Sequence, residues 1–273
     1  MYSLSKLLSL PLVILAAIIF FYAGDGTLSI WIFLPVLLGV ALYVFHGPID
    51  YWGMQHFPPK FDPKLLDWLI KNFPQYNEMF ENDQKLFQNR LVLYIDSRLF
   101  QSVGSELRDV PFDIKAMISA HAVLMGLHHK DLLIGDFDRI FLYKHPFYTP
   151  DKKYLHTVET NTEDGVIILS LEQAVNSILS PKHYYNIVFH AYAEAYIFLL
   201  GTDSFGDDFS STMDDAIYEM GFSPAELRTQ LGEEILNPIA LHITFYFAYS
   251  SKYREKFPFQ ARNLDSIFKN STR

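Results

Sequence analysis

The sequence predicts an α+β fold, a mostly helical domain with a small sheet, preceded by a transmembrane hairpin of two helices. Three observations carry this prediction. The first fifty residues contain two long apolar runs. Over several later segments, apolar residues recur three and four positions apart, the spacing of one helix face. Runs of β-branched and aromatic residues are few and short, which favours a small sheet beside a helical body.

The two apolar runs occupy residues 7–23 and 28–45. Each is about long enough to cross a hydrocarbon core as a helix. The short Gly/Asp turn between them allows only a tight antiparallel pair. A cleaved signal peptide is the alternative, but cleavage after Ala23 would place Phe21 where a small residue is needed. We therefore expect residues 1–50 to form a transmembrane helical hairpin.

The charges beside the hairpin predict its orientation. Lys6 precedes it, Lys60 and Lys64 follow it, and the turn carries Asp25 and no basic residue. Basic residues favour the cytoplasmic side of a membrane. We expect an inner-membrane or plasma-membrane protein with both termini in the cytoplasm.

Residues 51–61, which include two adjacent prolines, read as a linker, and residues 62–273 read as one domain. Asp62 and Pro63 have the pattern of an N-cap followed by proline in the first helical turn. Strands are expected at residues 139–143 and 166–170. Helices are expected at about residues 62–70, 76–99, 113–127, 171–177, 184–200, 214–220, 224–231 and 238–253.

Composition excludes several classes of function. The chain has no Cys, which excludes disulfides, thiolate metal sites and thiol catalysis. Its formal net charge is −9, whereas a nucleic-acid binder needs a basic face for phosphates. We expect no nucleic-acid partner.

The stretch NIVFHAYAEAY, residues 186–196, carries the clearest chemical signal. In an H-E-x-x-H helix, two His residues four positions apart hold zinc, and the Glu beside the first is the general base. Here His190 keeps the first position, Ala191 replaces the base, and Glu194 replaces the second His. Taken alone, a His and a Glu four apart are more often a helical side-chain pair.

Three blocks of the chain resemble the MtfA family of cytosolic zinc metallopeptidases, which are linked to glucose regulation. The first block is residues 100–146, with the helix IKAMISAHAVLMGLHH and the strand FDRIFLYKHPF. The second joins VIILSLEQAV to NIVFHAYAEAY, and the third is NPIA at residues 237–240. The resemblance runs from about residue 58 to about residue 268, and rests on the order and spacing of the blocks.

The resemblance implies a metallopeptidase-like domain whose site is altered. The family's first zinc ligand falls on His190 and is kept, its general base falls on Ala191, and its second ligand falls on Glu194. Its third ligand, a Glu, falls on Ala240, and a Tyr that precedes that ligand falls near Glu233. Three of the four chemical positions, the base and two ligands, are therefore changed.

These changes predict an inactive pseudopeptidase with no catalytic residue and no bound cofactor, in which His190 and Glu194 remain as vestigial metal ligands. The alternative is an active zinc metallopeptidase with a non-standard site. His242 is a candidate third ligand for such a site, but it lies two residues beyond Ala240, about 200° around a helix, and should face elsewhere.

The expected role is a membrane-anchored binding or regulatory module. Residues 1–50 would contact the membrane, and the old substrate groove would hold a protein or peptide. The resemblance makes a transcriptional regulator one candidate partner, because family members interact with a repressor of glucose uptake. A third interpretation is a structural membrane protein whose hairpin is itself the function.

Overall fold

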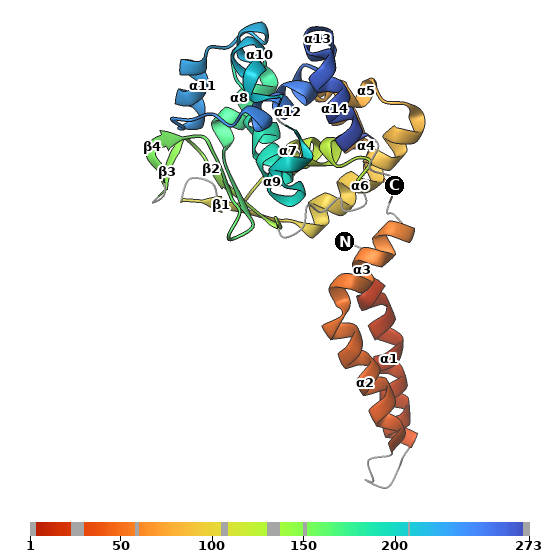
Figure 1. Ribbon diagram of the computed structural model, residues 1–273. Helices are drawn as coiled ribbons and strands as arrows, with labels where there is room; N and C mark the ends of the chain where they lie inside the picture. Colours follow the sequence, from red (N-terminus) through yellow and green to blue (C-terminus); the bar gives the residue numbers. More distant parts are fainter. Residues whose placement is uncertain are drawn as a thin grey trace. The chain divides into compact units, whose positions relative to one another are not determined.

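The computed structural model describes residues 4–22, 30–57, 60–104, 109–129, 137–149, 152–206 and 208–269. The chain divides into two compact units, Met1–Phe61 and Asp62–Arg273 (Figure 1). The turn expected between the two apolar runs lies outside the described residues.

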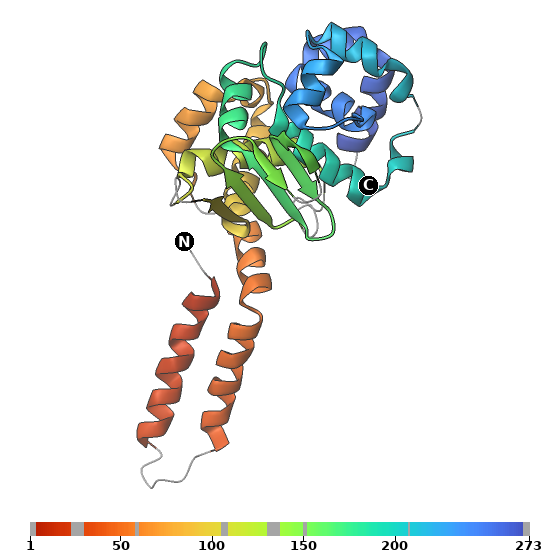
Figure 2. The same ribbon diagram turned by 90° about the vertical axis from the view of Figure 1, so that its left-hand side faces the viewer.

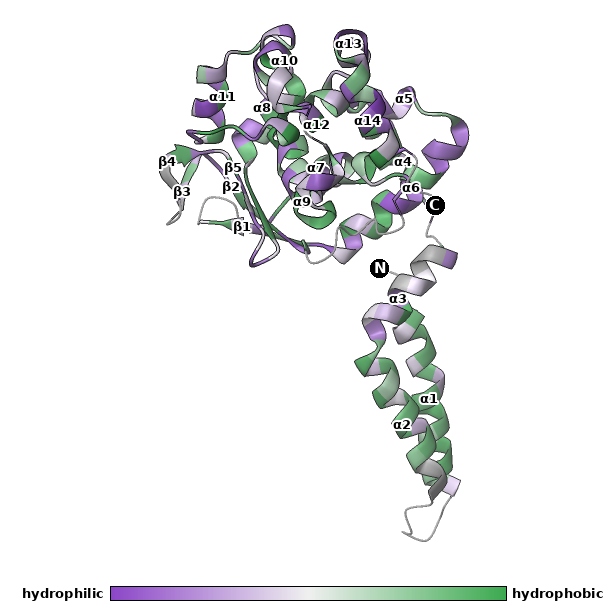
Figure 3. Cartoon of the chain, viewed as in Figure 1, coloured by the Kyte–Doolittle hydropathy of each residue, from purple (hydrophilic) through white to green (hydrophobic). Residues whose placement is uncertain are grey.

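The N-terminal unit contains α1 (Leu4–Tyr22), α2 (Ile30–Val44) and α3 (His46–His56). The side chains of α1 and α2 are almost wholly apolar (Figure 3). Within the described part of the chain, α1 alone has both the length and the hydropathy of a membrane-spanning helix. The segment expected to be a linker, residues 51–61, is helical through His56, because α3 continues across it.

A polar contact joins α1 to α3 within this unit. The backbone N–H of Ser5 donates to Oδ1 of Asp50 at 2.7 Å, and its hydroxyl donates to Oδ2 at 3.0 Å. The first turn of a helix leaves its N–H groups without partners in the helix, so Asp50 satisfies one of them. Gly53 lies against Leu4, whose side chain would be 2.9 Å from an added Cβ.

The second unit confirms the expected α+β class. Asp62 caps α4 by accepting from the N–H of Lys64 at 2.9 Å, as its pattern with Pro63 predicts. The helices are α4 (Pro63–Asn72), α5 (Pro74–Asn77), α6 (Glu81–Ser97), α7 (Phe112–Met125), α8 (Leu171–Leu179), α9 (Ile187–Leu200), α10 (Met213–Glu219), α11 (Pro224–Leu231), α12 (Pro238–Ala248), α13 (Ser250–Lys256) and α14 (Pro258–Phe268), with 3₁₀ turns at Thr202–Ser204 and Ser210–Thr212.

The main sheet has the strand order β1-β2-β6-β5. Its strands are β1 (Leu99–Val103), β2 (Arg139–Tyr143), β5 (Val158–Asn161) and β6 (Val166–Ser170). Strands β1, β2 and β6 are parallel, and β5 is an antiparallel edge strand. Strands β3 (Phe147–Thr149) and β4 (Lys152–His156) form a separate hairpin.

Helices cover one face of the main sheet; in Figure 2 they lie behind the strands, and the opposite face of the sheet is turned toward the viewer. Burial alternates along β2, where Ile140 and Leu142 are fully buried and their neighbours are half-buried. Such alternation is typical of a sheet with one face on the core. Helix α9 contacts β5, β6, α7 and α12, so the core is built around it.

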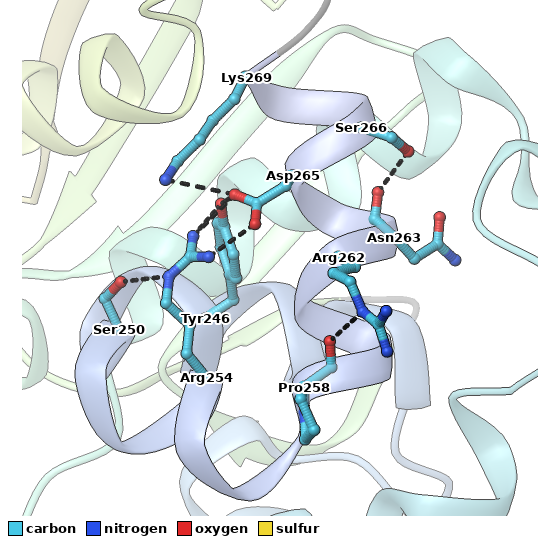
Figure 4. Close-up of polar contacts among 9 residues, drawn as sticks. All are labelled: Tyr246, Ser250, Arg254, Pro258, Arg262, Asn263, Asp265, Ser266 and Lys269. Carbon is cyan, nitrogen blue, oxygen red and sulfur yellow. Dashed lines mark hydrogen bonds and ion pairs between the residues drawn. The ribbon is translucent and has the colours of Figure 1, made fainter.

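The last three helices are joined by a polar cluster around Asp265 (Figure 4). Arg254 donates to both carboxylate oxygens, at 2.6 and 2.8 Å, and the Tyr246 hydroxyl donates to Oδ1 at 2.7 Å. Burial raises the pKa of Asp265, but these hydrogen bonds outweigh burial and hold the pKa at about 2. The ionised carboxylate is therefore the form that ties α14 to α12 and α13.

The low pKa of Asp265 predicts a pH-dependent contribution to stability. Because the folded-state pKa lies below the unfolded one, the contribution is complete above about pH 4 and is lost as the pH falls towards about 2. Asp265→Asn should lower the free energy of unfolding at pH 7 by about 1 kcal/mol and flatten its fall in this acid range. Denaturant melts of the full chain at pH 7, 4 and 3 measure both effects.

Asp138→Asn is the matched control, because Asp138 is an exposed carboxylate whose ion pair with Arg139 spans 3.6 Å. The control should melt like the wild type at each pH. Equal acid sensitivity of the wild type and Asp265→Asn would contradict the prediction.

Candidate metal centre

Helix α9 places His190 and Glu194 on one face, as their spacing predicts. The side chain of Asn186 caps the helix by accepting from the N–H of Phe189 at 2.9 Å, and Gly201 ends it with a φ of 77°. His190 is fully buried, while 22% of the Glu194 side chain is exposed. Nε2 of His190 lies 3.7 Å from Oε1 of Glu194. The ring nitrogen is therefore directed at the carboxylate.

Tyr185 holds the other nitrogen of the same ring. Its hydroxyl lies 2.8 Å from Nδ1 of His190, and both side chains are fully buried. Burial raises the pKa of Tyr185 well above its usual value, and the nearby carboxylates of Glu194 and Glu233 raise it further. Tyr185 therefore stays a neutral phenol that fixes the ring orientation, the role that an outer-shell residue plays behind a metal-binding His.

A third candidate ligand comes from a loop that the sequence interpretation did not assign to the site. Glu233 follows α11 and lies so that one carboxylate oxygen is within 4.8 Å of the ligand atoms of both His190 and Glu194. Glu233 is half-buried, and its backbone N–H donates to the carbonyl of Arg228 at 3.1 Å. One imidazole and two carboxylates are thus brought together from two distant parts of the chain.

Gly232 positions this loop. It ends α11 in the left-handed conformation, with a φ of 67°. A Cβ added at Gly232 would lie 2.2 Å from Cβ of His156, which is fully buried beside Glu159. Only glycine allows this close approach. The contact with His156, at the end of the β3–β4 hairpin, therefore positions the loop that carries Glu233.

Gln230 connects the same loop to the ligand helix. Its backbone carbonyl accepts a hydrogen bond from the Thr157 hydroxyl. Its side-chain oxygen accepts from Nε2 of Gln173 at 2.9 Å and from the N–H of Tyr185 at 3.1 Å. The residue that orients His190 and the loop that carries Glu233 therefore share one hydrogen-bonded support.

Alanine occupies the positions of the family's base and third ligand, so neither side chain can take a proton or bind a metal. Ala191 and Ala240 are both fully buried, and the carbonyl of Ala191 accepts from the Thr160 hydroxyl at 3.2 Å. His242 faces elsewhere, as its place on the helix predicts. Its Nδ1 lies 2.7 Å from the Tyr253 hydroxyl, and burial lowers its pKa to about 4.

An open cavity of about 400 Å³ adjoins Glu194. It lies beside edge strand β5 and the end of α9, and its lining residues are Thr160, Thr162, Glu194, Ile197, Phe198, Gly201, Thr202 and Asn237. A second hollow of about 370 Å³ lies near the start of α9 and includes His121. His121 is fixed there by Met117 and Asn186, and its pKa is lowered to about 4 by burial, which fits a core role.

A model of the glucose-regulated metallopeptidase M90 family matches residues 54–195, just over half of the chain. The chain belongs to this family. The match includes the whole His190–Glu194 pentad and confirms the resemblance inferred from the sequence, but it ends before Glu233 and Ala240. No curated protein matches the chain. The M90 domain thus contains a group of three residues that can hold a metal ion, with one member outside the matched region.

The close approach at Gly232 predicts a stability effect. Gly232→Ala places a side chain in the left-handed region, which costs about 1–2 kcal/mol, and also forces Cβ against His156. Gly221→Ala is the matched control, because Gly221 has a φ of 90° and nothing within 4 Å of its added Cβ. In denaturant melts, Gly232→Ala should lose more stability than the control. Equal losses would show that the packing against His156 is not tight.

Proposed function

We propose that this M90 domain binds an extended peptide or protein segment without hydrolysing it. Residues 1–50 would anchor it in the inner or plasma membrane, with both termini in the cytoplasm. The observation that carries the proposal is Ala191, a fully buried residue without a titratable group at the family's base position. A positioned general base typically contributes about 10²–10⁴-fold to a rate, so its loss removes a major part of peptidase chemistry.

The other carboxylates beside His190 do not replace that base. Glu194 and Glu233 converge on the ring together, in positions suited to holding a metal. A bound zinc would polarise a carbonyl group or a water molecule. A carboxylate coordinated to that ion is not free to take a proton. The residues that hold a metal here therefore leave the proton-transfer role unfilled.

The geometry next to the ligand helix suits an extended chain. Strand β5 is the edge of the main sheet, and Thr160 connects it to α9 through the carbonyl of Ala191. An edge strand presents backbone groups with which an extended peptide can pair. The 400 Å³ cavity beside it can accept a side chain, and Phe198, 56% exposed, provides an apolar wall. A transcriptional regulator is one partner that would fit the family context.

A second candidate function is an active metallopeptidase with a non-standard site. Glu233 favours it, because it completes three potential ligands, the number in a catalytic zinc site. The difference between the two functions is hydrolysis, and it is measurable directly.

We expect no metal-dependent peptide hydrolysis by the wild type, because Ala191 provides no base. The full chain, purified in detergent and supplied with Zn²⁺, should leave a library of fluorogenic peptides uncleaved. Glu233→Gln is the control, and it should show the same background signal. Cleavage that a chelator stops and that Glu233→Gln abolishes would establish the active peptidase instead.

Binding is the positive test of the proposal. Peptides would be selected from a displayed library of random short sequences on the full chain in nanodiscs. Their affinity should fall about tenfold or more in Phe198→Glu, which places a charge on the apolar wall of the cavity. Tyr218→Glu is the matched control, because Tyr218 is 81% exposed on α10 and does not line this cavity. Equal peptide binding by the wild type and Phe198→Glu would refute binding at this groove.

A further inference from the structure

The side chains of His190, Glu194 and Glu233 converge on a common point. Their ligand atoms all lie within 4.8 Å of one another, and Nε2 of His190 is 3.7 Å from Oε1 of Glu194. Two carboxylates this close repel each other unless positive charge lies between them. A metal ion held between them would supply that charge.

The distances fit a metal ion. Zinc binds His nitrogen and carboxylate oxygen at about 2.0–2.2 Å, so the ligand atoms of a tetrahedral site are about 3.3–3.6 Å apart. The separation of 3.7 Å between His190 and Glu194 is already close to this range. The carboxylate of Glu233 ends a half-buried side chain, and its ligand atom lies within 4.8 Å of the other two.

The orientation of the ring also fits. When Nδ1 of His190 carries the hydrogen and donates to the Tyr185 oxygen, Nε2 has its lone pair directed toward the two carboxylates. Metal-binding His residues almost always use their second nitrogen in this way, which fixes the tautomer. Gln230 supports both Tyr185 and the loop of Glu233, so the ring and the distant carboxylate are positioned together.

We propose that His190, Glu194 and Glu233 bind one divalent transition-metal ion of the zinc type, with Glu233 replacing the ligand that is missing at position 240. A neutral imidazole and two carboxylates balance the charge of such an ion. Mixed nitrogen and oxygen ligands suit zinc better than magnesium, which prefers oxygen ligands alone. Three protein ligands would leave a fourth position open, and Glu194 also lines the open cavity.

This site does not depend on the proposed function, because metal binding and peptide binding are measured separately. Peptide affinity is measured on chelator-treated protein, so a failure of either proposal leaves the other distinguishable.

The test uses the full chain in detergent, stripped with a chelator and then titrated with Zn²⁺ against a chromophoric competitor. Elemental analysis after dialysis should give one zinc per chain, and zinc should raise the midpoint of thermal unfolding. A tenfold excess of Mg²⁺ should not displace it. Glu233→Gln should weaken zinc binding by more than about 100-fold, the upper end of the effect of outer-shell partners.

Glu234→Gln is the matched control, since it changes the neighbouring exposed carboxylate, which accepts from the Tyr154 hydroxyl. It should bind zinc like the wild type. Tyr185→Phe tests the positioning role and should weaken binding about 10–100-fold. Circular-dichroism melts of the metal-free variants check that each one folds. Failure of the wild type to retain zinc, or equal zinc binding by a folded Glu233→Gln, would overturn the proposal.

Discussion

The burial of α9 is the constraint on which the rest of the second unit depends. The helix is apolar around nearly its whole circumference, and it contacts strands β5 and β6 of the sheet as well as α12. Full burial of an aromatic or aliphatic side chain contributes about 1.5–3 kcal/mol, and α9 buries several, among them Phe189 and Tyr192. This packing buries His190. Because buried polar atoms need polar partners, both ring nitrogens must have one nearby.

The sequence predicted the parts of the site that are local. A cap at Asn186 and an i, i+4 pair are set by neighbouring residues, so the helix and the shared face of His190 and Glu194 followed directly from the pattern. The family assignment followed from the order and spacing of three sequence blocks between about residues 58 and 268. Helix α9 also begins and ends within a few residues of its predicted limits.

Glu233 could not be assigned in the same way, because its place depends on tertiary approach. It reaches His190 only because α11 ends at Gly232 against His156, a contact between segments far apart in the sequence. Comparison with the family pattern placed a tyrosine near residue 233 and the third ligand at residue 240. A glycine just after a predicted helix, followed by acidic residues, was the available signal. Strands β1, β3, β4 and β5 were also missed, because each is short, and the partner of β1 lies far along the chain.

Helix α1 has the length and hydropathy of a membrane-spanning helix, and if it spans a membrane the contact of Ser5 with Asp50 has a mechanical consequence. An isolated membrane helix adjusts to bilayer thickness by tilting or sliding along the membrane normal. Here Asp50 holds the first turn of α1 through two hydrogen bonds, so α1 cannot slide without moving α3. In a thinner or thicker membrane the two helices would therefore move together. A mismatch between the length of α1 and the bilayer thickness would therefore also displace α3, the segment that leads into the second unit.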